Sequence, residues 1–120
     1  MHDSGKRQKF SSGAVRDTAE DKPMLELISP YAEERLGTWL TKGSKKYKAR
    51  NWELGLPFQR TFASLKRHVN KFNKGNMDED HLAAIMCNAM FLIHYEEMIK
   101  IGALPADLDD MPKYEQRRKK

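Results

Sequence analysis

The sequence predicts an all-α protein in which three main helices follow an extended N-terminal arm. Apolar residues recur at intervals of three and four along three segments, and no segment shows the alternating pattern of a strand. The 120 residues suit one domain, and 39% apolar against 32% charged residues suits a modest core. We divide the chain into an arm (1–22), a helical domain (23–112) and a basic tail (113–120).

The first helix is expected near residues 30–41. Ser29 is a suitable N-cap, Pro30 suits the first helical position, and Gly43 is expected to end the helix. The segment 43–57 has neither helical nor strand periodicity, so we expect a basic loop there.

The second helix is expected near residues 57–74, where apolar residues step by four and three and form one narrow seam. The third is expected near 79–101, with Asp78 as its cap. It is apolar on nearly every side from Leu82 to Ile93, which is typical of a helix surrounded by protein. Because two other helices barely suffice to cover it, we expect a homodimer or a larger homo-oligomer to complete the fold.

The charge is unevenly distributed along the chain. The net charge is +5, but residues 35–74 hold eleven Lys or Arg against Glu53 alone, while 75–112 carry a net charge of −7. Such a divided surface suits a small polyanion near a metal better than a long duplex, so nucleic acid is not the expected partner. Two solvated faces remain the alternative interpretation.

The composition of the chain excludes several classes of protein. No run approaches the roughly 18 apolar residues of a membrane span, and the N-terminus does not resemble a secretory signal. Cys87 is the single cysteine, which excludes an internal disulfide and suits a reducing cytosol. We therefore expect a cytoplasmic protein with no membrane partner.

A polar stripe interrupts the apolar third helix. His81, Asn88 and Tyr95 are spaced by seven, and polar groups in that setting must be satisfied. One interpretation is structural: Asn88 bonds the backbone of 43–57, and His81 caps the helix. The other is that the stripe faces a cleft in which carboxylates hold a divalent cation. The candidate ligands are Glu53 and Asp80.

Basic and aromatic residues supply candidate phosphate and base contacts. Arg67 offers a planar donor fork, and His68 is either a core residue or a phosphate contact. The loop pairs cations with an aromatic platform, a combination that binds nucleotides, although basic loops are also common solvated loops. The loop residues concerned are Lys45, Lys46, Arg50 and Trp52. We expect one pocket bounded by this loop, the polar stripe, and Arg67 or His68. His81 and His94, which are 13 apart, do not have the spacing of a helical zinc pair.

Five blocks of sequence carry a family resemblance. They are GAVRDTAEDKP (13–23), KGSKKYKARNWELGLP (42–57), LKRHVNKF (65–72), DEDHLAAIMCNAMFLIHYEEMI (78–99) and LPADLDDMP (104–112). Together they resemble the family of phage dATP/dGTP diphosphohydrolases. The resemblance implies a phage origin, hence the host cytoplasm, and an all-α, MazG-like pyrophosphohydrolase. It also implies hydrolysis of a purine deoxynucleoside triphosphate to monophosphate and pyrophosphate with Mg²⁺.

From the match to the family and from the chemistry of the basic loop, we expect particular roles for individual residues. The catalytic residues are Glu53, Asp80 and His81, with Glu53 and Asp80 binding the metal. The substrate-binding residues are Lys45, Lys46, Arg50, Trp52, Arg67, His68 and Asn88. MazG-like enzymes carry EExxE and ExxD motifs, whereas here Glu33 and Glu34 are followed by Gly37 in place of the third acid. One possibility is that the metal site is built differently, from Glu53, Asp80 and Asn88. The other is that the chain is a non-catalytic phage protein that sequesters a nucleotide or a cyclic oligonucleotide signal, or blocks a host defence protein.

Overall fold

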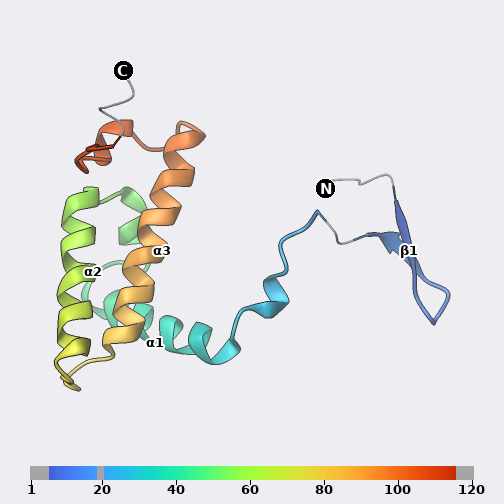
Figure 1. Ribbon diagram of the computed structural model, residues 1–120, viewed down its shortest axis with the longest axis horizontal. Helices are drawn as coiled ribbons and strands as arrows, with labels where there is room; N and C mark the ends of the chain where they lie inside the picture. The colour runs from blue at the N-terminus through green and yellow to red at the C-terminus, as the bar shows by residue number, and fades with distance from the viewer. Residues whose placement is uncertain (1–5, 19–20, 116–120) are drawn as a thin grey trace.

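The computed structural model describes residues 6–18 and 21–115, and it is mostly helical (Figure 1). The helices are α1 (Pro30–Lys46), α2 (Phe58–Asn73) and α3 (His81–Lys100). α2 and α3 lie side by side and antiparallel, and α1 packs across the N-terminal half of α3 (Figure 1). The predicted all-α class with three main helices is confirmed. Residues 1–5 and 19–20 of the arm and 116–120 of the basic tail lie outside the described part.

α1 starts where the sequence predicts but ends later. The Ser29 hydroxyl accepts a hydrogen bond from the Ala32 N–H at 3.2 Å, as expected of an N-cap. The expectation that Gly43 ends the helix is wrong, because the helix continues to Lys46 and the Tyr47 N–H donates to the Gly43 carbonyl at 2.9 Å. A glycine costs an interior turn only about 1 kcal/mol relative to alanine, so neighbouring turns can carry a helix through it.

The segment expected to be a loop therefore contains the last turn of α1 and a short 3₁₀ turn, η2 (Asn51–Leu54). Gly55, which follows it, has φ +101°, and a Cβ there would lie 2.7 Å from Leu108 Cδ1. Only glycine suits both the left-handed backbone and this close approach. The segment thereby passes directly against η3 (Ala106–Leu108).

The residues after α3 complete the start of α2. Pro57, at the N-cap of α2, has no side chain that can accept a hydrogen bond. Asp110 takes this role instead, since its Oδ1 accepts from the Gln59 N–H at 2.8 Å and its carbonyl from Gln59 Nε2 at 2.6 Å. The segment after α3 is thus held against the start of α2.

α3 begins at His81 and is capped by Asp80 rather than by Asp78. The Asp80 carboxylate accepts from the Ala83 N–H at 3.2 Å. Tyr95 is fully buried and His81 is buried, so the predicted stripe does face protein. By contrast Ile93 remains 61% exposed, so the chain alone does not surround this helix.

The arm contains two short strands, so the expectation that it has none is wrong. β1 (Arg7–Lys9) and β2 (Val15–Asp17) form an antiparallel hairpin, with an ion pair between Arg7 and Asp17. Three-residue strands are too short to show a periodicity. Gly13, at φ +93°, supplies the turn. The hairpin stands away from the helices (Figure 1).

The length and apolar composition of α3 differ from the expectation that no segment could span a membrane. By length and composition it is long and apolar enough to cross a membrane. Core helices pass the same criterion, and the buried polar side chains of α3 bond to other parts of this chain. The absence of a membrane partner stays a prediction.

We predict that a second copy covers the seam of α2, where Phe62, Val69 and Phe72 are 38%, 43% and 53% exposed. Val69→Glu places a charge on that seam and should shift a wild-type oligomer to monomer, because burying a carboxylate is costly. Asn70→Glu, one position along the same helix, is the control. Analytical ultracentrifugation at micromolar concentration decides, and a monomeric wild type would contradict the prediction.

Candidate functional site

A cavity of about 230 Å³ lies where the C-terminal half of α1, the segment after it, α2 and α3 meet. Aromatic and aliphatic side chains make most of its wall, and a few polar groups converge on it. It is lined by Trp39, Leu40, Gly43, Ser44, Tyr47, Lys48, Ala49, Asn51, Trp52, Leu56, Ser64, His68, Cys87, Asn88 and Phe91. Apolar concavities with a few placed polar groups are the usual form of a small-molecule site.

Trp52 lines this cavity and is held by neighbouring aromatic rings. Its ring stacks on Phe91 with centroids 4.7 Å apart and an interplanar angle of 15°. His94 meets the same indole edge-on at 4.8 Å. Aromatic pairs in these arrangements contribute beyond their buried area, so the indole is held in one orientation.

Tyr95 holds the backbone behind Trp52. Its hydroxyl donates to the Trp52 carbonyl oxygen at 2.6 Å, and its side chain is fully buried. Burial raises the pKa of Tyr95 to about 12, so the phenol stays protonated and remains a donor at neutral pH.

Asn88 also lies on the cavity wall. Its Nδ2 donates to the Ala84 carbonyl at 2.9 Å and lies 3.4 Å from Ser64 Oγ. The interpretation that Asn88 satisfies the backbone of 43–57 is therefore wrong. Tyr95 makes that contact.

The structure brings together part of the predicted pocket. The predicted residues that line the cavity are Trp52, His68 and Asn88. Those that do not line it are Lys45, Lys46, Arg50, Arg67 and His81. Other lining residues were not predicted, and they include Trp39, Tyr47, Lys48 and Phe91. Trp39 and Gly43 are four residues apart and share a face of α1, because the helix continues past Gly43. A helix that ended before Gly43 would not form this wall of the cavity.

The two predicted metal-binding carboxylates are each paired with an arginine. Glu53 Oε2 accepts from Arg50 Nη1 at 2.9 Å. The Asp80 carboxylate accepts from Arg35 Nε at 2.9 Å and from Nη2 at 2.5 Å, which is a two-point contact. The hydrogen bond from Arg35 lowers the pKa of Asp80. The structure thus places Glu53 and Asp80 in separate ion pairs.

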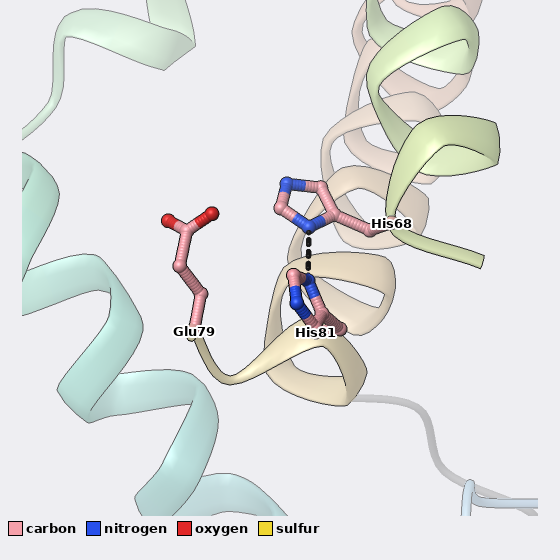
Figure 2. Close-up of side chains that lie close together, drawn as sticks. All are labelled: His68, Glu79 and His81. Atoms are coloured by element: carbon pink, nitrogen blue, oxygen red, sulfur yellow. Dashed lines mark hydrogen bonds between the residues drawn. The ribbon is translucent and has the colours of Figure 1, made fainter. Parts of the chain in front are cut away.

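A second polar cluster adjoins the cavity at the start of α3. His68 Nδ1 and His81 Nδ1 lie 2.9 Å apart, and Glu79 points its carboxylate toward the same space (Figure 2). His81 Nε2 lies 2.8 Å from Asp78 Oδ1. Burial lowers the pKa of His68 below its ordinary value. His68 belongs to both features, because its ring also meets Trp39 edge-on at 5.7 Å.

We predict that Tyr95→Phe lowers the free energy of unfolding by about 1–3 kcal/mol, because a buried carbonyl loses its donor. Chemical denaturation measures this value. Tyr31→Phe is the matched control, since Tyr31 is 77% exposed and should change stability little. Equal effects of both substitutions would contradict the role assigned to the Tyr95 hydroxyl.

We also predict that Asp80→Asn flattens the loss of stability in acid. The folded-state pKa of Asp80 lies below its ordinary value of 3.8, so its ion pair stabilises the fold above that pH and is lost as the pH falls through the folded pKa. Asparagine keeps the helix cap but not the charge. Unfolding free energies compared at pH 7 and below about pH 4 test this. Asp107→Asn, at an exposed position, should retain the wild-type loss.

The chain is similar to one known protein family and to a phage protein. Residues 12–102 match the family described as "dATP/dGTP diphosphohydrolase, N-terminal". The dATP/dGTP diphosphohydrolase of Salmonella phage PMBT28 is 33% identical over 78 residues, which are 61% of this chain and 27% of that relative. No solved structure matches the chain. Since the family match spans well over half of its residues, the chain belongs to the dATP/dGTP diphosphohydrolase N-terminal family.

Proposed function

We propose that this chain binds a purine deoxynucleoside triphosphate and takes part in its hydrolysis to monophosphate and pyrophosphate. The observation that supports this best is the cavity lined by Trp39, Trp52 and Phe91, because aromatic side chains are stacking surfaces for a base. The name of the phage relative agrees with purine triphosphates as ligands. A phage protein with this role would act in the host cytoplasm.

The size of the cavity suggests how such a ligand would lie. At about 230 Å³ it is smaller than the roughly 300–1,000 Å³ of sites that enclose a whole drug-sized ligand. It suits a base, with the triphosphate outside. Lys48 lines the cavity and lies close in sequence to exposed Lys45 and Lys46, so these three cations are the proposed phosphate contacts.

The polar lining suits the edge of a purine. Asn88, Asn51 and Ser64 supply amide and hydroxyl groups to a wall that is otherwise largely apolar. Carboxamides can pair with two adjacent polar atoms of a purine. We therefore propose that these side chains recognise the base and that the lysines recognise its phosphates.

Magnesium is part of the activity that the resemblance implies. Mg²⁺ requires a compact, nearly octahedral set of oxygen ligands. Glu53 and Asp80 do not fit one shared site in this arrangement, because each is bound to its own arginine. We assign no catalytic step to them, and any role of Mg²⁺ is left to the triphosphate to which it binds in solution.

The same ion pairs favour a second candidate function, which is binding without cleavage. A chain that captures a nucleotide, or a cyclic oligonucleotide with the same bases, needs the aromatic wall and the cations but no free carboxylate. The two functions differ in what happens to the ligand.

We predict that Lys48→Ala weakens binding of dATP or dGTP about tenfold, which corresponds to the loss of about 1.4 kcal/mol. Lys74→Ala, an exposed lysine after α2, is the matched control and should leave affinity unchanged. Calorimetric titration measures both, with dCTP and dTTP expected to bind more weakly.

The recovered ligand separates the two candidate functions. After incubation with Mg²⁺, monophosphate and pyrophosphate indicate hydrolysis, whereas intact triphosphate released on denaturation indicates capture. No binding of any of the four nucleotides by folded wild-type protein would reject both.

A further inference from the structure

We infer that His68, Glu79 and His81 form a binding site for a transition-metal ion, for which zinc is the best fit. The site is separate from the proposed magnesium role and does not depend on nucleotide binding. It joins the C-terminal half of α2 to the start of α3 (Figure 2).

The ligand atoms are already close enough for one ion. One nitrogen from each histidine and one carboxylate oxygen of Glu79 all lie within 4.8 Å of one another. Zn–N bonds of about 2.0–2.1 Å at a tetrahedral centre separate two ligand nitrogens by about 3.3 Å. The two Nδ1 atoms are 2.9 Å apart, so they need to open by only a few tenths of an ångström.

A carboxylate outside the cluster orients His81. Asp78 Oδ1 lies 2.8 Å from His81 Nε2, and a carboxylate can only accept there. In the neutral ring the proton therefore sits on Nε2, which leaves the Nδ1 lone pair directed toward His68. In the metal-free protein His68 Nδ1–H donates to this lone pair, and binding of an ion requires His68 to carry its proton on Nε2 instead. Metal-binding histidines usually donate their second N–H to a carboxylate in this way, because it fixes the tautomer and strengthens the ligand.

The surroundings hold two of the three ligands in place. His81 is only 3% exposed, and the ring of His68 rests edge-on against Trp39. The two-point contact between Asp80 and Arg35 anchors the residue between Glu79 and His81. Glu79 itself is exposed, which gives an ion a path from solvent.

The donor set selects the class of metal. Two imidazoles and one carboxylate suit zinc and its neighbours, whereas Mg²⁺ and Ca²⁺ prefer oxygen ligands alone. Three protein ligands leave one tetrahedral position for water or another small ligand, as in open zinc sites.

The test is a titration of tag-free, metal-free protein with Zn²⁺, and with Co²⁺ as a spectroscopic probe. We expect one equivalent to bind, the melting temperature to rise with Zn²⁺, and Co²⁺ to give the visible absorption of a tetrahedral site. Mg²⁺ at the same concentration should produce neither effect. Failure of saturable binding at one equivalent would overturn the inference.

Glu79→Gln is the decisive variant, because the side chain is exposed and its removal leaves the packing intact. We expect its affinity for Zn²⁺ to fall at least tenfold, and Asp78→Asn to weaken binding about 10–100-fold as a positioning residue. Glu96→Gln, an exposed glutamate of α3, is the control. Wild-type affinity in Glu79→Gln would reject this ligand set. Nucleotide binding measured without added metal reports on the proposed function independently.

Discussion

The hydrogen bond from the Tyr95 hydroxyl to the Trp52 carbonyl oxygen is the contact on which the cavity depends. The segment between α1 and α2 has one short 3₁₀ turn and few backbone bonds of its own. Tyr95 attaches it to α3, and the Trp52 ring can then lie flat on Phe91. A buried phenol needs an acceptor, so the tyrosine in an otherwise apolar stretch is explained by this carbonyl. The same contact therefore fixes the α1–α2 connection, and with it this part of the cavity wall, against α3.

The separation of charge along the sequence has a concrete consequence in the structure. The basic segment meets the acidic start of α3 in a direct contact between Arg35 and Asp80. A guanidinium matches a carboxylate with two parallel hydrogen bonds and needs no bridging ion. Arg50 likewise occupies Glu53. The sequence shows that a basic and an acidic segment are present. Which arginine pairs with which carboxylate depends on the path of the backbone.

How far the sequence predicts this protein follows from the range of the interactions concerned. Three helices follow from periodicity and from local signals such as the Ser29 cap, which acts over three residues. The end of α1 was missed because a glycine is a weak local signal that packing overrides. Asp110 could not be identified as the partner of the α2 N-terminus, since 51 residues separate it from Gln59. Of the candidate site, the stacking Trp52 was found from residue type, but Trp39 and Phe91 required the packing of the helices.

Two pairs of histidines have the same spacing in the sequence but very different distances in the structure. Ligand spacing within one helix therefore does not identify a site that is formed by two helices. His81 and His94 are 13 residues apart on α3, a separation of about 20 Å along the axis. His68 and His81 are also 13 residues apart, yet their nitrogens lie 2.9 Å from each other. The difference is the turn at Gly75, whose φ of +82° lets the chain reverse between α2 and α3. His68 lies seven residues before Gly75 and His81 six residues after it, so the reversal of the chain brings the two rings together.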